Sequence, residues 1–180
     1  MRLVEQPSMH AIGDHLWHSA LVFASFLLQH GLNDLRAGTR PTTVIELGSG
    51  YGLVSLAVAA LQEESDRGNE REAAKIFATD LPDIVDTTLK DCLSLNSSLA
   101  KRIVPQALTW GSSTSRAVQE ELIRNTTASS RLTILASDVL YNSDSHLPFL
   151  ETLLELVRVA GGFADIVIAY KHRIAGDDLF

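Results

Sequence analysis

Five short runs of apolar, β-favouring residues alternate with segments of helical spacing along the chain, and this alternation constrains the fold more than any other feature. Each run is almost continuously hydrophobic, which is typical of strands buried on both faces of a parallel sheet. The pattern predicts an α/β fold with a Rossmann-like, doubly wound and mostly parallel sheet. The predicted strands are residues 43–47, 75–79, 102–108, 132–136 and 165–170.

Predicted helices fill most of the chain between and before these strands. Asp83 follows a proline at the start of one helix, so we expect its side chain to cap that helix. Gly161 and Gly162 follow the last helix and are expected to stop it. The helices are predicted at residues 16–28, 53–61, 83–96, 112–125 and 147–159, with a helix extension and exposed loop at 62–75 and a polar loop at 126–130.

Length and composition narrow the class of protein. The 180 residues suggest one domain, and 46% hydrophobic with 21% charged residues is ordinary for a globular chain. A net charge of −7 argues against a nucleic-acid partner, and the absence of both an apolar run of roughly 18 residues and a signal peptide argues against a membrane or secreted protein. Cys92 is the only cysteine, which excludes an internal disulfide and a cysteine zinc cluster. We expect a soluble protein of the cytoplasm, with the nucleus as a second compartment.

A glycine-rich turn follows the first predicted strand. Gly48, Gly50 and Gly52 stand at alternate positions where the chain must turn sharply from strand into helix. Glycine tolerates positive φ and lets a ligand approach the backbone closely, and ligands of open α/β sheets bind beyond the carboxyl ends of the strands. The G-x-G-x-G spacing differs from the G-x-G-x-x-G of dinucleotide-binding proteins, and the sequence contains no G-x-x-x-x-G-K-[ST] phosphate loop.

Two carboxylates flank this turn. Glu46 stands at the end of the first strand, where it suits a cationic amino group better than a pyrophosphate. Asp80 ends the next strand, where it can accept both hydroxyls of a ribose. Together these residues predict a ligand that joins adenosine to an amino acid, as S-adenosyl-L-methionine does. The alternative is a tight turn in a Rossmann-like protein with Asp80 as a helix N-cap.

At these positions the sequence resembles the seven-β-strand S-adenosylmethionine-dependent methyltransferases, and more narrowly methyltransferase family 16, which includes protein-lysine methyltransferases. Val44–Gly52 resembles the cofactor loop of the family, and Thr79–Pro82 its ribose-binding turn. Leu108–Gly111 resembles its L-x-W-G segment, and Ser137–Tyr141 contains its D-x-x-Y motif. The resemblance covers about residues 13–173, with further matches at 13–17, Asn96 and 169–173.

The resemblance implies methyl transfer from S-adenosylmethionine to a protein side chain, with lysine Nε as the leading acceptor. Asp138 and Tyr141 are implied as catalytic residues at the mouth where the target side chain enters. Trp17 would close the methionine end of the cofactor, and Trp110 would wall the adenine. The implied cofactor-binding residues are Trp17, Glu46, Gly48, Gly50, Gly52, Asp80, Trp110 and Ser137.

The chemistry of methyl transfer defines what these residues must do. The reaction is an in-line displacement in which the cofactor brings the methyl group and the protein supplies alignment. A lysine amine attacks only when neutral, and desolvation in a narrow apolar channel lowers its pKa from about 10.4. Because a nearby carboxylate favours the charged amine, we expect Asp138 first to bind and orient the target, with deprotonation through water as a second role. Packing roles stay open for Trp17, Trp110 and Tyr141.

The sequence departs from the family after the fifth predicted strand. The chain ends at Phe180, whereas the family continues with a helix and two more strands. We therefore expect the last two strands to be missing and the apolar fifth strand to be a sheet edge, which invites pairing. Either the chain is a fragment or a partner chain covers that edge. Residues 1–180 are treated as one methyltransferase domain, with a leading helix region at 1–40 and a cofactor-binding core at 41–180.

Other functions stay open at this point. A methyltransferase-like module could bind partners without catalysis, and an active enzyme could methylate histidine or a small molecule. The glycine spacing and Glu46 count against a nucleotide-dependent oxidoreductase. His10, His15 and His18 lie close together but lack partners at zinc-binding spacing, so we expect no metal. For the leading function we expect a protein substrate with a basic or lysine-containing segment, because the chain is acidic.

Overall fold

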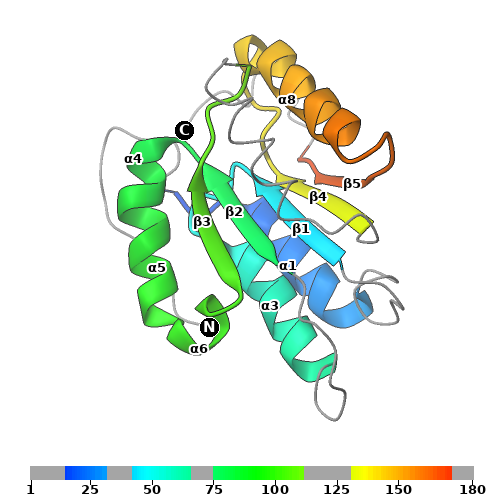
Figure 1. The fold of residues 1–180 in the computed structure, drawn as a ribbon. Helices are drawn as coiled ribbons and strands as arrows, with labels where there is room; N and C mark the ends of the chain where they lie inside the picture. Colours follow the sequence, from blue (N-terminus) through cyan, green and yellow to red (C-terminus); the bar gives the residue numbers. More distant parts are fainter. Residues whose placement is uncertain (1–14, 32–41, 66–74, 112–130, 172–180) are drawn as a thin grey trace.

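The computed structural model describes residues 15–31, 42–65, 75–111 and 131–171 of the 180-residue chain. Its strands form one sheet in the order β3-β2-β1-β4-β5, and every neighbouring pair is parallel (Figure 1). This architecture confirms the predicted Rossmann-like α/β fold. The strands are β1 (Thr42–Leu47), β2 (Ile76–Asp80), β3 (Ile103–Ala107), β4 (Arg131–Ser137) and β5 (Asp165–Ala169).

The strand β1 lies at the centre of the sheet and is buried on both faces. Val44, Ile45 and Leu47 are fully buried. Ile45 pairs with Phe77 of β2 on one side and with Ile134 of β4 on the other. A strand surrounded in this way needs hydrophobic residues at almost every position. All five predicted strands agree with the structure to within one residue at each end.

Helices cover both faces of the sheet (Figure 1). On one face, α1 (His18–His30) packs beside α3 (Leu53–Ser65). On the other face lies α8 (His146–Val159). These three helices confirm the predicted ones, with starts and ends shifted by up to four residues. Gly161 and Gly162 follow α8 with φ values of +83° and +89°, in agreement with the predicted stop.

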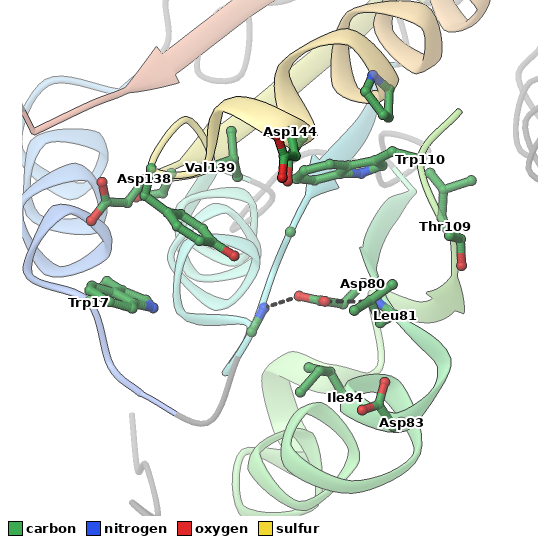
Figure 2. A pocket seen from close by; sticks show the side chains of 17 residues that line it. Trp17, Asp80, Leu81, Asp83, Ile84, Thr109, Trp110, Asp138, Val139 and Asp144 are labelled. Carbon is green, nitrogen blue, oxygen red and sulfur yellow. Dashed lines mark hydrogen bonds between the residues drawn. The ribbon is translucent and has the colours of Figure 1, made fainter. Parts of the chain in front are cut away.

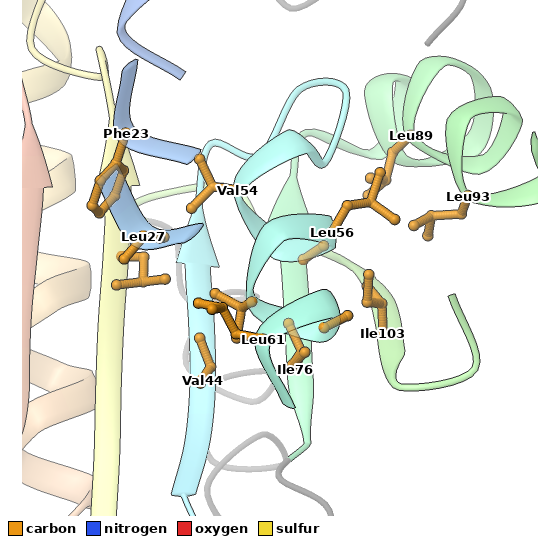
Figure 3. Packing of buried hydrophobic residues seen from close by; sticks show 14 of the residues in the cluster. Phe23, Leu27, Val44, Val54, Leu56, Leu61, Ile76, Leu89, Leu93 and Ile103 are labelled. Carbon is orange, nitrogen blue, oxygen red and sulfur yellow. The ribbon is translucent and has the colours of Figure 1, made fainter. Parts of the chain in front are cut away.

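The two larger hydrophobic clusters of the core lie on opposite faces of the sheet, and a small third one joins α1 to α3. In the first, which Figure 3 shows, Leu27 of α1 and Leu56 of α3 pack over Val44 and Ile76. In the second, Phe149 and other residues of α8 pack on the opposite face of β1 and β4. The sheet is therefore held between two apolar layers, and its strand ends are free to carry polar residues.

The segment after β2 is helical but irregular. Leu81 is the N-cap and Pro82 takes the first helical position, so the predicted capping by Asp83 is wrong. Proline suits this position because the first N–H groups of a helix have no internal partner. Asp83 is exposed in the first turn, where a negative charge faces the positive end of the helix dipole. The elements are α4 (Pro82–Ile84), the π-helical turn η2 (Val85–Leu89), α5 (Lys90–Leu95) and α6 (Ser97–Ala100).

The π-helical turn faces the glycine-rich turn. Leu89, its last residue, is fully buried, and its Cδ1 lies 2.7 Å from where a Cβ on Gly52 would be. Further along, Asn96 ends α5 and donates from Nδ2 to the carbonyl of Cys92 at 2.8 Å. Cys92 itself is buried on this helix.

Some expectations fall outside the described residues. These are the predicted helix at 112–125, the loop at 126–130, residues 66–74 of the segment predicted at 62–75, His10, and the parts of the family matches at 13–14 and 172–173. In the part of the chain that the structure describes, β5 pairs with β4 alone, and its side chains alternate between partly buried and exposed. No helix in these ranges combines the length and hydrophobicity needed to cross a membrane.

Candidate functional site

A cavity of about 570 Å³ opens at the carboxyl ends of the strands (Figure 2). Its lining comes from the turns after β1, β2, β3 and β4, together with Trp17 just before α1. Among the described lining residues there are four aspartates and no lysine, arginine or histidine. The aspartates are Asp80, Asp83, Asp138 and Asp144. The cavity is therefore strongly acidic and suits a ligand with positive charge.

The glycine-rich turn forms one wall of the cavity. Gly48, Gly50 and Gly52 all have positive φ, at 69°, 50° and 70°. A Cβ on Gly48 would lie 2.9 Å from Val139 and 3.4 Å from the ring of Trp110, so only glycine fits this wall. Gly48 and Gly50 line the cavity, whereas Gly52 lies behind it against the helix.

Asp80 connects two turns at the base of the cavity. Its Oδ2 accepts a 2.7 Å hydrogen bond from the N–H of Gly50, and its Oδ1 accepts a 2.8 Å bond from the N–H of Leu81 (Figure 2). Burial raises the pKa of Asp80; these two bonds oppose the rise, and the charge of Asp83 adds to it. Each carboxylate oxygen has two lone pairs, so Asp80 can still accept hydrogen bonds from ligand hydroxyls. The alternative interpretation of Asp80 as a helix N-cap is wrong, because Leu81 takes that position.

Glu46 lies beneath the glycine-rich turn and outside the cavity lining. Its Oε2 accepts hydrogen bonds from the N–H of Ser55 at 2.9 Å and from the Ser55 hydroxyl at 2.5 Å. Burial raises the pKa of Glu46 to about 8; the bonds from Ser55 lower it, and the charge of Asp80 adds to the rise. In this arrangement Glu46 anchors the first turn of α3 below the cavity. Its direct contact with a ligand amino group stays a prediction.

The segment after β4 forms the opposite wall. Asp138 is 4% exposed, adopts φ +56°, and its N–H donates to the carbonyl of Ala169 at 2.9 Å. The hydroxyl of Ser137 is buried and has no hydrogen-bond partner within the described ranges, so it can donate to or accept from a ligand. Both residues line the cavity, as does Tyr141.

An aromatic pair lies at the mouth of the cavity. The ring of Trp17 stacks on that of Tyr141 with a centroid distance of 6.1 Å and an interplanar angle of 13°. Figure 2 shows Trp17 and Asp138 on the same side of the cavity. Tyr141 is 42% exposed, so the pair borders both the cavity and solvent. The structure thus brings together residues separated by most of the chain.

Trp110 walls the far end of the cavity. Its ring lies beside Gly48 and contacts Phe149 edge-on, with centroids 5.1 Å apart at 67°. Trp110 therefore lines the cavity and also packs against the core. Gly111 donates to the hydroxyl of Thr152 at 3.0 Å, which holds this segment to α8.

Several lining residues were absent from the sequence-based prediction. The positions of Asp83 and Ile84 follow from Asp80, because residues just after a strand end lie at the same edge of the sheet. Asp144 and Pro148 gave no such signal, because their placement depends on the irregular segment before α8. The searched part of the chain holds no cluster of His, Cys, Asp and Glu side chains suited to a metal ion.

Comparisons with known proteins identify a family and several relatives. A family model described as lysine methyltransferase matches residues 1–180. The protein-lysine methyltransferase METTL21E of Mus musculus is 35% identical over 146 residues, which cover 79% of this chain and 49% of that protein. The protein-lysine N-methyltransferase EFM6 of Saccharomyces cerevisiae is 27% identical over 188 residues, which cover 100% of this chain and 72% of that protein.

A third relative carries no functional name. The UPF0665 family protein C23C4.06c of Schizosaccharomyces pombe is 25% identical over 171 residues, which cover 95% of this chain and 46% of that protein. The chain thus spans about half the length of two of these three relatives.

Proposed function

Because the chain belongs to the lysine methyltransferase family, we propose that its cavity binds S-adenosylmethionine and that the protein transfers the methyl group to a lysine side chain of another protein. The observation that carries this proposal is the acidic cavity at the strand ends, where the glycine-rich turn and Asp80 are joined by a hydrogen bond. Two of the relatives are named as protein-lysine methyltransferases.

The residues of the cavity fit this cofactor. S-adenosylmethionine carries a sulfonium and an ammonium group, and the lining supplies carboxylates without a competing cation. Asp80 would hold the ribose hydroxyls, Gly48 and Gly50 would let the ligand approach the backbone, and Trp110 would wall the adenine. The buried, unpartnered hydroxyl of Ser137 would bind a polar group of the ligand. A dinucleotide is disfavoured because its pyrophosphate would meet these carboxylates.

The residues at the mouth would act on the acceptor side of the reaction. When bound, S-adenosylmethionine supplies a methyl group on a positively charged sulfur, which a neutral amine attacks in line. Asp138 is buried at this end and would orient the amine, and it would receive the released proton through water. The rings of Trp17 and Tyr141 would bind the lysine in its cationic form as it enters, before it loses the proton and attacks as the neutral amine.

The rim of the cavity indicates the chemistry of the protein substrate. Asp83 and Asp144 are exposed and line the cavity from the segments after β2 and β4. Carboxylates at the rim would attract lysine or arginine residues that flank the target lysine. We therefore propose a basic segment as the substrate, bound more weakly as ionic strength rises.

Calorimetric titration with S-adenosylmethionine tests the cofactor, with its demethylated product and NAD as comparisons. We expect binding of the first two and none of NAD. Transfer of a labelled methyl group to lysine-containing peptides then tests the reaction, with peptides in which lysine is replaced by arginine or histidine as controls. Binding without transfer to any acceptor would favour a non-catalytic module, and transfer to histidine or to a small molecule would reassign the acceptor. A folded chain that does not bind S-adenosylmethionine would refute the proposal.

A further inference from the structure

The wall that carries Asp138 and Tyr141 is built from an irregular segment between β4 and α8. It contains only one short element of regular structure, the 3-10 turn η3 (Ser143–Ser145). The side chain of Asn142 accepts a 3.0 Å hydrogen bond from the N–H of Asp144, which shapes this turn. The position of Tyr141 must therefore be fixed by contacts outside a helix or strand ladder.

One such contact comes from the first residue of α8. Nε2 of His146 lies 3.0 Å from the carbonyl oxygen of Leu140. Because a carbonyl oxygen can only accept, the imidazole must donate from Nε2. The bond therefore ties the start of α8 back to the residue just before Tyr141.

The bonded carbonyl belongs to the peptide unit that leads into Tyr141. A peptide unit is planar, so fixing the carbonyl of Leu140 also fixes the direction of the Tyr141 N–H and Cα. The side chain of Leu140 is partly buried against the second core cluster, which holds the other end of this unit. Tyr141 in turn contacts Trp17 by ring stacking.

We propose that His146 is a positioning residue that holds Tyr141 in its stacked place at the cavity mouth. His146 does not line the cavity, so it acts through Tyr141 rather than by touching a ligand. Its relevance to catalysis rests on the proposed methyltransferase function, but its effect on the aromatic pair does not. The two can therefore be tested separately.

The test uses tryptophan fluorescence of the full chain. The sequence has two tryptophans, so a Trp110→Phe background leaves Trp17 as the reporter of the stacked pair. In that background we expect His146→Ala to raise acrylamide quenching of Trp17, because loss of one hydrogen bond shifts the balance between ordered and displaced segments by roughly two- to tenfold. His146→Gln keeps an N–H donor and should restore most of the original value. His146→Leu also lacks the donor but keeps most of the side-chain volume. It should show the same rise in quenching as the alanine variant, and it replaces that variant if His146→Ala does not fold.

Leu147→Ala is the matched control. Leu147 follows His146 on α8, is 64% exposed and does not line the cavity, so its removal should leave quenching unchanged. Calorimetry without the Trp110 change should show S-adenosylmethionine affinity reduced by no more than about tenfold in His146→Ala and restored in His146→Gln. Methyl transfer to a lysine peptide should fall in the alanine variant and recover in the glutamine variant.

Two results would overturn the inference. The first is unchanged Trp17 quenching in His146→Ala and His146→Leu. The second is a glutamine variant as defective as the alanine variant, which would show that the imidazole acts by packing. If even the unaltered chain fails to bind S-adenosylmethionine, the proposed function fails, and the quenching comparison still decides the role of His146.

Discussion

The backbone N–H of Gly50 donates a 2.7 Å hydrogen bond to Oδ2 of Asp80, and this bond joins the turns that follow two neighbouring parallel strands. The other oxygen of the same carboxylate accepts from the N–H of Leu81. One side chain therefore fixes two pieces of backbone at the base of the cavity. Because these bonds already hold both turns in place, they reduce the ordering that binding would require.

Asp80→Ala should weaken S-adenosylmethionine binding by about 1–3 kcal/mol, because two backbone donors and the ligand hydroxyls lose their acceptor. Asp80→Asn keeps one carbonyl oxygen as an acceptor, so its S-adenosylmethionine affinity should lie between those of the unaltered chain and Asp80→Ala. Asp83→Ala is the control, since it removes an exposed rim carboxylate and leaves the bond to Gly50 intact. Calorimetry checks all three variants, and equal affinity in Asp80→Ala and the unaltered chain would contradict the assigned role.

Gly48→Ala should both destabilise the protein and abolish cofactor binding. Its Cβ would lie 2.9 Å from Val139, at a φ of +69° that costs an L-residue about 1–2 kcal/mol. Gly161→Ala isolates the cost of the positive φ from that of the close contact, because Gly161 has a φ of +83° and no atom lies within 4 Å of the added Cβ. Urea unfolding should show the larger loss for Gly48→Ala, and only this variant should lose S-adenosylmethionine binding. Similar losses in both would mean that the contact with Val139 is unimportant.

The buried carboxyl of Glu46 predicts a pH dependence of stability. Its pKa is raised in the folded protein to about 8 from an ordinary value of 4.5, so the folded state holds a proton that the unfolded state releases. The stability from this proton is fully present below about pH 4.5 and is lost as the pH rises to about 8, at no more than about 1.4 kcal/mol per pH unit. Above about pH 8 Glu46 is ionised in both states, so it no longer changes the free energy of unfolding with pH.

Glu46→Gln removes this titration and keeps an oxygen that can accept from Ser55. Urea unfolding between pH 5 and 9 should show the free energy of unfolding of the unaltered chain falling relative to the glutamine variant, and then levelling off. If the difference in free energy of unfolding between the two chains does not change with pH, or if rising pH favours the unaltered chain, Glu46 is ionised in the folded state.

Tyr141→Phe separates the ring of this residue from its hydroxyl. The stacking on Trp17 should persist, so S-adenosylmethionine affinity should stay within about twofold, while methyl transfer slows by roughly tenfold through loss of one hydrogen bond to the acceptor. Tyr141→Ala should lose both ring and hydroxyl and slow transfer further. Steady-state rates with a labelled methyl donor check the order of the three. Full activity of the phenylalanine variant would assign Tyr141 to packing alone.

The strands β1, β2 and β4 were predictable because burial on both faces demands apolar residues at nearly every position. The sequence also predicted that Asp80 and the glycine-rich turn lie close together, since the ends of adjacent parallel strands meet at one edge of the sheet. The hydrogen bond between Asp80 and Gly50 became visible only in the structure. The capping role of Asp83 was predicted wrongly because the preceding Pro82 already takes the first helical position. The π-helical turn that ends at Leu89 has no periodic signature of its own and is associated with packing against the glycine-rich turn.

The remaining features of the site depend on irregular backbone. The stacking of Trp17 on Tyr141 joins two segments outside helices and strands, and hydrophobic periodicity carries no information about such contacts. Glu46 was expected at the ligand, but its bonds to Ser55 became visible only once β1 and α3 were placed together. Sequence patterns therefore located the edge of the sheet that bears the cavity, and tertiary structure determined which side chains face it.

The pairing of β1 with β4 has a consequence for synthesis of the chain on the ribosome. Ile45 pairs with Phe77, which is made soon afterwards, but also with Ile134, which is made much later. At ordinary translation rates the open edge of β1 waits on the order of ten seconds for β4. During that interval the central strand of the sheet has unpaired backbone groups on one side. An unpaired strand edge can pair with other chains, so aggregation competes with folding until β4 is made.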